Sequence, residues 1–138
     1  MSNDVDIYAL LGRQYREGTV LEPNEPCGVC KSWGQTTSDF LVTLPEFLII
    51  QLSRFKAGKK SHMMVRFPAT GLNLLPYVEP NLRSTLQTSF DLQSVIHHVG
   101  STMRQGHYIT FNRRSSANDW VRHDDERMTV VGIDAGIK

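Results

Sequence analysis

Apolar residues near the start of the chain recur at the spacing of one helix face: Ile7, Leu10, Leu11 and Tyr15. This pattern predicts a short amphipathic helix. Ser2 and Asn3 are expected to cap its beginning, and Gly18 is expected to end it. From Gly18 to Gly34, frequent Gly, Pro and Asn residues predict a loop or knuckle instead of a regular element.

Strand-like patterns dominate the remainder of the chain. Phe40–Leu44 alternates between apolar and polar residues, and Phe47–Phe55 is a nearly continuous apolar run, typical of a central strand buried on both faces. Ala57–Lys60 predicts a turn and Glu79–Ser89 an exposed loop. Five further strands are expected near Met63–Phe67, Phe90–His98, His107–Asn112, Asp119–His123 and Met128–Ile133. This order predicts an α+β fold, an antiparallel β-sheet with an N-terminal helix.

Composition and charge narrow the class of protein. Hydrophobic residues make up 40% of the chain and charged residues 21%, which is ordinary for a globular domain. Fifteen Lys and Arg residues against fourteen Asp and Glu leave a net charge of +1, so neither nucleic acid nor a membrane surface is an expected partner. One basic cluster is predicted to be a solvated turn between strands, with a binding patch as the less favoured alternative: Arg54, Lys56, Lys59, Lys60 and Arg66.

The beginning of the chain carries charges at Asp4, Asp6 and Arg13, which a secretory signal would not have. The longest strongly apolar stretch, Phe47–Ile50, is far too short to cross a bilayer. We therefore expect the protein to lie in the cytoplasm or nucleus.

The two cysteines of the sequence, Cys27 and Cys30, lie in one Cys-Gly-Val-Cys stretch. In a reduced compartment this close spacing favours a metal-binding pair over a loop-closing disulfide. A structural zinc ion needs four ligands, and here there is one pair. We expect a structural zinc only if a second ligand pair is supplied from elsewhere.

A hairpin geometry pairs a histidine with an aspartate. If residues 113–118 close a symmetric hairpin, Phe111 lies opposite Trp120 and His107 lies opposite Asp124. Asp125 would then point to the other face, unless the register slips by one residue. Such a carboxylate can orient an imidazole that serves a nucleophile, and Gly106 would let substrate backbone approach closely. An ordinary surface His–Asp pair is the alternative.

Five sequence blocks stand in a characteristic order: LPEFLIIQLSRF at 44–55, VRFP at 65–68, FDLQSVIHHVG at 90–100, GHYITF at 106–111 and WVRHDD at 120–125. This order resembles the C-terminal half of the ubiquitin-specific protease domain, a cysteine-type deubiquitinase. The resemblance implies the palm-like sheet half of a papain-like cysteine protease fold. Residues 1–43 would form a fingers-like helix and Cys-x-x-Cys knuckle, and residues 44–133 a sheet with the histidine and aspartate boxes.

Carried over residue by residue, the resemblance makes His107 the general base, Asp124 its orienting carboxylate and Asp125 an auxiliary carboxylate. Phe55, His98 and Tyr108 match positions that contact the ubiquitin tail, and Gly106 lies among them. Residues 101–105 would form a mobile loop over the tail channel. The implied reaction is hydrolysis of the bond after the C-terminal glycine of ubiquitin, through a thioester and with no cofactor for the chemistry. Cys27 and Cys30 match a zinc-binding knuckle of the family.

The nucleophilic cysteine box of the family has no counterpart in this sequence. Cys27 and Cys30 are the only thiols, and neither the residue after Cys30 nor its spacing to His107 fits a papain-like nucleophile. The chain is therefore expected to be a fragment or an inactive form, with a missing N-terminal half or a partner chain. The alternatives are a catalytically dead module that binds ubiquitin or assembles a complex, and a relic without a function of its own.

Overall fold

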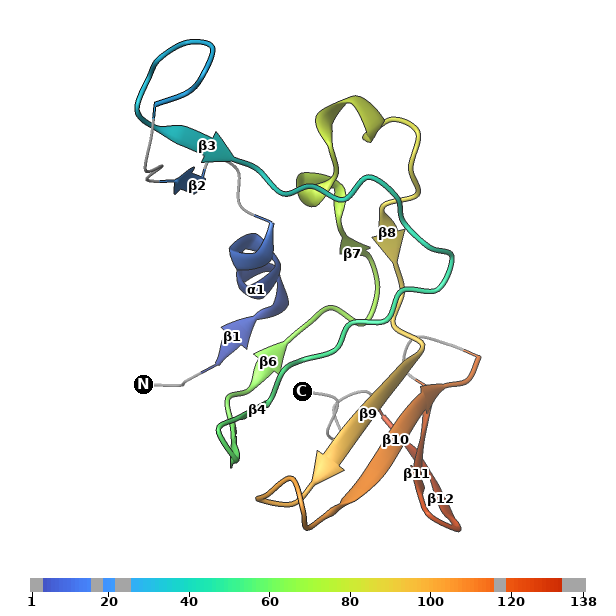
Figure 1. The fold of residues 1–138 in the computed structure, drawn as a ribbon. Helices are drawn as coiled ribbons and strands as arrows, with labels where there is room; N and C mark the ends of the chain where they lie inside the picture. Colours follow the sequence, from blue (N-terminus) through green and yellow to red (C-terminus); the bar gives the residue numbers. More distant parts are fainter. Residues whose placement is uncertain (1–3, 16–18, 22–25, 116–118, 133–138) are drawn as a thin grey trace.

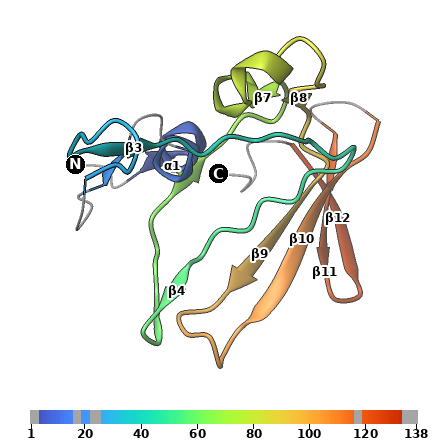
Figure 2. The same ribbon diagram turned by 45° about the horizontal axis from the view of Figure 1, so that its top comes forward.

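A four-stranded antiparallel sheet is the largest sheet among the residues that the structure describes. In the computed structural model, which describes residues 4–15, 19–21, 26–115 and 119–132, its strands run in the order β12-β11-β10-β9. Their bounds are Ser94–Val99 for β9, His107–Arg113 for β10, Trp120–Asp124 for β11 and Arg127–Val131 for β12. Figures 1 and 2 show the twisted sheet, with each strand following its neighbour along the chain.

The core of this sheet lies on one face, as the alternation of its strands requires. Ile109, Phe111 and Trp120 are buried together, and Trp120 has no exposed surface. Three partly buried residues pack against them: Leu92, Val95 and Val131. The opposite face is open, with Ile96 exposed to 71% and Met128 to 72%.

The register of the central hairpin differs from the symmetric one. Phe111 lies opposite Arg122, and Trp120 lies opposite Arg113, so the strands are displaced by two residues from the predicted pairing. A shift of two residues keeps every side chain on its expected face. Phe111 and Trp120 therefore remain diagonal neighbours in the same core.

The N-terminal helix α1 spans Ile7–Gln14 and begins differently from the prediction. Asp6 caps it, because its carboxylate accepts a hydrogen bond of 2.8 Å from the Tyr8 backbone N–H. The predicted caps Ser2 and Asn3 and the predicted stop Gly18 lie outside the described residues. Just before the helix, the short strand β1 (Val5–Asp6) pairs in parallel with β6 (Val65–Arg66), where Ile7 and Val65 are both buried.

Three short antiparallel pairs complete the strands that the structure describes. They are β2 with β3 (Thr19–Leu21, Gln35–Thr37), β4 with β5 (Phe55–Lys56, Lys59–Lys60) and β7 with β8 (Leu72–Asn73, Ser89–Phe90). The turn predicted at 57–60 is confirmed, since Ala57 and Gly58, both at positive φ, connect β4 to β5. Two 3-10 helices lie between β7 and β8, Leu75–Tyr77 and Pro80–Leu82, and the second of them occupies part of the predicted loop.

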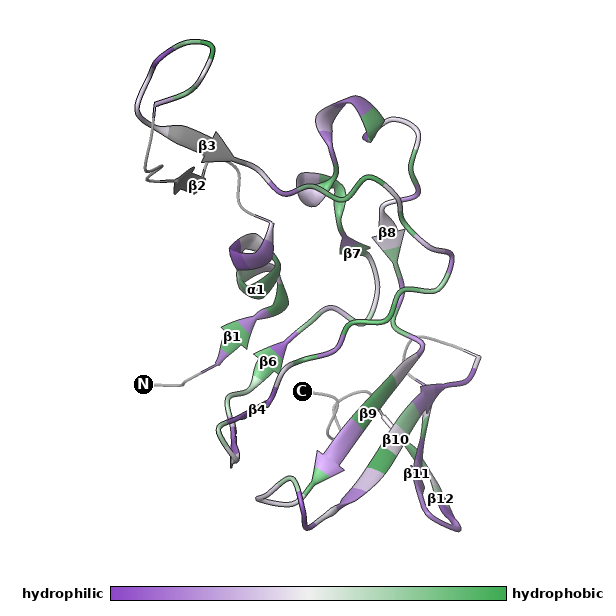
Figure 3. Ribbon diagram, viewed as in Figure 1, coloured by the Kyte–Doolittle hydropathy of each residue, from purple (hydrophilic) through white to green (hydrophobic). Residues whose placement is uncertain are grey.

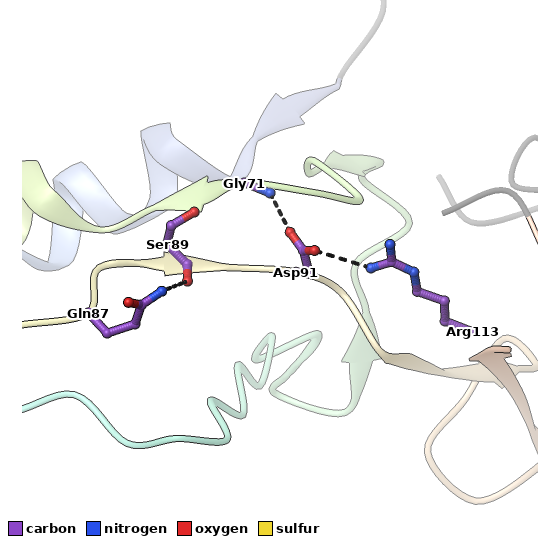
Figure 4. Close-up of polar contacts among 5 residues, drawn as sticks. All are labelled: Gly71, Gln87, Ser89, Asp91 and Arg113. Atoms are coloured by element: carbon purple, nitrogen blue, oxygen red, sulfur yellow. Dashed lines mark hydrogen bonds and ion pairs between the residues drawn. The ribbon is translucent and has the colours of Figure 1, made fainter. Parts of the chain in front are cut away.

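The predicted strand Phe90–His98 is interrupted, because Asp91 ties the chain at the interruption. The Asp91 carboxylate accepts a hydrogen bond of 2.9 Å from the Gly71 N–H and lies 3.5 Å from the Arg113 guanidinium (Figure 4). Nearby, the Gln87 amide donates to the Ser89 carbonyl over 3.3 Å. Residues 89–90 therefore belong to the β7–β8 pair, and β9 starts only at Ser94.

The central buried strand predicted at Phe47–Phe55 is wrong. Only Phe55 of this run is in a strand, and the segment before it is extended chain without a strand partner among the described residues (Figure 3). Phe47 is 78% exposed and Ile49 is 91% exposed. The apolar side chains of this segment are suited to burial, but no other segment in the described part of the chain covers them.

No helix within the described ranges has the length and hydrophobicity needed to cross a membrane.

Replacing Phe111, which is 3% exposed in the sheet core, by alanine should lower the free energy of unfolding by about 3–5 kcal/mol. The loss combines removed apolar contacts with the cavity left beside Trp120. Ile96→Ala, on the open face of β9, is the matched control and should stay within about 0.5 kcal/mol. Urea unfolding followed by tryptophan fluorescence measures both. Equal losses for the two variants would contradict the one-sided core.

Candidate active site

His107 and Asp124 meet at the end of the β10–β11 hairpin. His107 begins β10 and Asp124 ends β11, and both project from the face that carries the core. The imidazole Nε2 lies 3.2 Å from Asp124 Oδ1, and the two side chains are 47% and 23% exposed. The contact predicted from the hairpin is therefore present, although the two residues are diagonal neighbours and not directly opposed.

Sequence reasoning missed Arg122 as a second partner of Asp124. The Arg122 guanidinium contacts Asp124 Oδ2, so each carboxylate oxygen has its own partner. Residues 122 and 124 lie two apart on one strand and share a face. That spacing is the signal that could have identified Arg122 in the sequence.

Asp125 occupies the two-residue turn between β11 and β12, with φ of 52°. Among the described residues, the ion pairs at this end of the sheet reach Asp124 and leave Asp125 without a cation. Its auxiliary role stays a prediction.

A second cluster brings together the residues predicted to bind substrate. The His98 ring lies 5.6 Å from the Phe55 ring, edge-on, and 5.0 Å from the Tyr108 ring. His98 and Tyr108 are directly opposed on β9 and β10, and Phe55 comes from β4. Geometry of this kind suits an extended peptide that lies along aromatic side chains.

Glycine is required at two positions beside this cluster. Gly106 has φ of 142°, and a Cβ there would lie 2.3 Å from the Val99 carbonyl oxygen and 2.6 Å from His98 Nε2. A Cβ on Gly100, at φ 145°, would lie 2.5 Å from the Gln105 carbonyl oxygen. The exposed loop of residues 101–105 runs between them, and its mobility stays a prediction.

Lys60 belongs to the basic cluster that was predicted to be solvated, and for Lys60 this prediction is wrong. Its ammonium donates to the carbonyl oxygens of His98 and Gly100, both at 2.7 Å, and lies 3.1 Å from His98 Nδ1. Arg54 is also engaged, through a hydrogen bond to the Met63 carbonyl oxygen. Three members of the cluster are exposed as predicted: Lys56, Lys59 and Arg66.

The two clusters lie on opposite faces of the same sheet end. His107 shares its face with Ile109, whereas Tyr108 and His98 project the other way. His97 opposes Ile109 on the His107 face, and burial lowers the pKa of His97, with Lys60 and Arg54 lowering it further.

Cys27 and Cys30 belong to the segment 26–34, which lies beyond the β2–β3 pair and away from the four-stranded sheet (Figure 1). A tight turn holds them: the Cys27 N–H donates to the Ser32 carbonyl, and the Lys31 N–H donates to the Cys27 carbonyl. Cys30 Sγ is exposed and lies 2.9 Å from Ser32 Oγ. Within the described ranges, no third His, Cys, Asp or Glu joins them in a group able to hold a metal ion. The donor set therefore fits half of a tetrahedral zinc site.

Comparison with known proteins assigns the family. The family model of ubiquitin carboxyl-terminal hydrolases matches residues 19–136. Ubiquitin carboxyl-terminal hydrolase 16 of Arabidopsis thaliana is 38% identical over 113 residues, which cover 78% of this chain and 10% of that protein. Ubiquitin carboxyl-terminal hydrolase 4 of Bos taurus is 32% identical over 111 residues, covering 76% and 11%. The chain therefore belongs to the ubiquitin carboxyl-terminal hydrolase family, and it spans about a tenth of the length of these curated relatives.

Solved structures with the same fold include chains of two SAGA DUB modules of Ubp8, Sgf11, Sus1 and Sgf73. One superposes with a TM-score of 0.74 and the other, bound to monoubiquitin, with 0.72. Both are 24% identical and cover 93% of this chain but 29% of theirs. The predicted fold class, the sheet half of a papain-like α+β fold, is confirmed.

The Cys30 thiol should react with iodoacetamide at near-neutral pH. The hydrogen bond with the Ser32 side chain is the largest cause that lowers the pKa of Cys30 to about 7, followed by the hydrogen bonds with the Ser32 backbone and the Cys27 side chain. Because the thiolate is the nucleophile, alkylation should rise through about pH 7. Ser32→Ala should move this rise upward in pH.

Site-resolved mass spectrometry on the chelator-treated chain measures the alkylation rate of each cysteine. Ser53→Ala, an exposed serine away from the knuckle, serves as the control. A wild-type rise centred near the ordinary thiol value of about 8.5 would contradict the effect of Ser32.

Proposed function

We propose that this chain supplies the histidine–carboxylate part of a cysteine-type deubiquitinase, with its nucleophilic thiol coming from outside the described residues. The observation that carries the proposal is the 3.2 Å contact between His107 Nε2 and Asp124 Oδ1. A carboxylate on one ring nitrogen fixes the tautomer and leaves the other nitrogen for a nucleophile. Membership of the ubiquitin carboxyl-terminal hydrolase family supports ubiquitin as the substrate.

The chemistry follows from which imidazole nitrogen is occupied. With Asp124 on Nε2, Nδ1 of His107 would take the proton from a cysteine thiol. The thiolate would attack the carbonyl carbon of the C-terminal glycine of ubiquitin, and the imidazolium would return the proton to the leaving amine. Water, deprotonated by the same imidazole, would then hydrolyse the thioester and restore the thiol. Asp124 stabilises the imidazolium in both steps.

The two thiols of this chain are poor candidates for that nucleophile. Cys27 and Cys30 lie near the β2–β3 pair, and Figure 1 places this pair and the sheet that carries His107 on different sides of the molecule. We propose that they instead form half of a structural zinc site, which needs a second ligand pair, and that the reaction itself uses no cofactor. A reduced compartment, the cytoplasm or nucleus, would preserve these thiols.

A second candidate function is a module that holds ubiquitin without cutting it. The Phe55–His98–Tyr108 cluster favours this candidate, because it is assembled by the described residues and needs no thiol. A structural neighbour is a DUB module bound to monoubiquitin together with other subunits, which supports a further partner chain here as well.

The chain by itself should not hydrolyse a fluorogenic amide at the C-terminus of ubiquitin. A general base and its orienting carboxylate without a nucleophile lose a factor on the order of a million in rate. Release of the fluorophore is measured with the wild type and with Cys27→Ala and Cys30→Ala. Turnover that disappears in either cysteine variant would place the nucleophile within this chain and contradict the proposal.

Monoubiquitin should bind weakly to the chain, and the contact should involve the ubiquitin C-terminal tail. Tyr108→Ala should weaken binding because Tyr108 is 64% exposed beside His98 and contributes aromatic contact area. The matched control is Ile96→Ala, on the same face of the neighbouring strand. NMR titration of labelled ubiquitin measures both. Binding that ignores removal of the last two glycines of ubiquitin would exclude the tail cluster as the site.

A further inference from the structure

We propose that Lys60 is a positioning residue that fixes the His98 imidazole as a hydrogen-bond donor and anchors the loop of residues 100–106. Its effect on ubiquitin binding rests on the function proposed above, whereas its effect on His98 does not. Lys60 ends β5 and is far from His98 in sequence, yet its ammonium makes all of its described contacts there.

One cross-strand pair delivers two groups to the same imidazole. Phe55 and Lys60 are directly opposed on β4 and β5, so their side chains share a face of this hairpin. The Phe55 ring packs edge-to-face with the His98 ring, and Lys60 reaches Nδ1 of His98. The turn at Ala57 and Gly58, both at positive φ, sets this pairing. The His98 ring therefore contacts both this hairpin and Tyr108, whose ring lies 5.0 Å away.

Because the Lys60 ammonium can only donate hydrogen bonds, it sets which nitrogen of the neutral His98 ring carries the hydrogen. An ammonium has three N–H donors and no acceptor, so a neutral imidazole beside it accepts at Nδ1 and carries its hydrogen on Nε2. The ring places Nε2 against the Gly106 backbone, where a Cβ would lie 2.6 Å away. The Nε2–H therefore lies next to Gly106, on the face opposite His107, where it can donate to a backbone carbonyl of an extended peptide.

The same ammonium closes the base of the loop. Lys60 Nζ bonds to the His98 and Gly100 carbonyl oxygens, both at 2.7 Å, at the end of β9. Gly100 and Gly106 lie so close that a Cβ on Gly100 would come within 2.8 Å of Gly106 Cα. Fixing Gly100 therefore fixes the entry to β10 and the position of His107.

The test compares Lys60→Met, which keeps the aliphatic stem, with Lys60→Gln, whose amide can also accept from Nδ1–H. Lys60→Arg, another pure donor, is the conservative variant, and Lys59→Met is the matched control because Lys59 is an exposed neighbour on the same strand. The His98 ring nitrogens are recorded by 15N NMR at about pH 8.5, where imidazoles are neutral. Amide exchange of residues 100–106 and the Kd for monoubiquitin are measured in parallel.

Wild type, Lys59→Met and Lys60→Arg should show the single Nε2–H tautomer. Lys60→Met and Lys60→Gln should show mixed tautomers, faster amide exchange in the loop and a Kd about tenfold higher, the size expected for one directed hydrogen bond. Unchanged amide shifts of β11 and β12 would confirm that the variants fold.

An unchanged His98 tautomer in both Lys60→Met and Lys60→Gln would overturn the positioning role. A tautomer that changes while wild type fails to bind monoubiquitin would instead leave Lys60 as a positioning residue and reject the proposed function.

Discussion

The pairing of β10 with β11 is the interaction on which the remaining structure depends. It places Trp120 in the core opposite Arg113 and brings Asp124 to the His107 face. A slip of one residue would turn Trp120 to solvent and move the neighbours of Asp124 into its place, at a cost of most of the apolar burial of this sheet. The register that buries the core therefore also sets the face from which the Asp124 carboxylate projects.

The sequence predicted the local part of this arrangement well. Alternating patterns located β9 to β12 within a few residues, and hairpin pairing predicted the His107–Asp124 contact with a register wrong by two residues. Each side chain is still predicted on the correct face of the sheet, because side-chain direction repeats every two residues. The register itself depends on the conformation of the loop that connects β10 to β11, and the alternation of apolar and polar residues does not reveal that conformation.

Other features depend on partners that are remote in the sequence, and these were not predicted. The run Phe47–Phe55 is apolar enough for a central strand, but a pattern cannot say whether a neighbouring strand exists. The parallel β1–β6 pair joins segments some sixty residues apart, as Val5 opposite Val65 shows. Lys60 was assigned to solvent because a charged residue in a turn is usually hydrated, whereas its bonds reach back to His98 and Gly100.

Because side chains alternate along a strand, residues on the two faces of β10 can be substituted independently of each other. Odd-numbered positions from His107 to Phe111 carry the proposed general base and the core, while Tyr108 belongs to the aromatic cluster on the other side. A single substitution at His107, which is half-exposed, would remove the proposed base without disturbing either the core or that cluster. An ancestor with both a general base and the aromatic cluster could thus lose the base in one substitution and keep the cluster. The fold would be the same before and after that change.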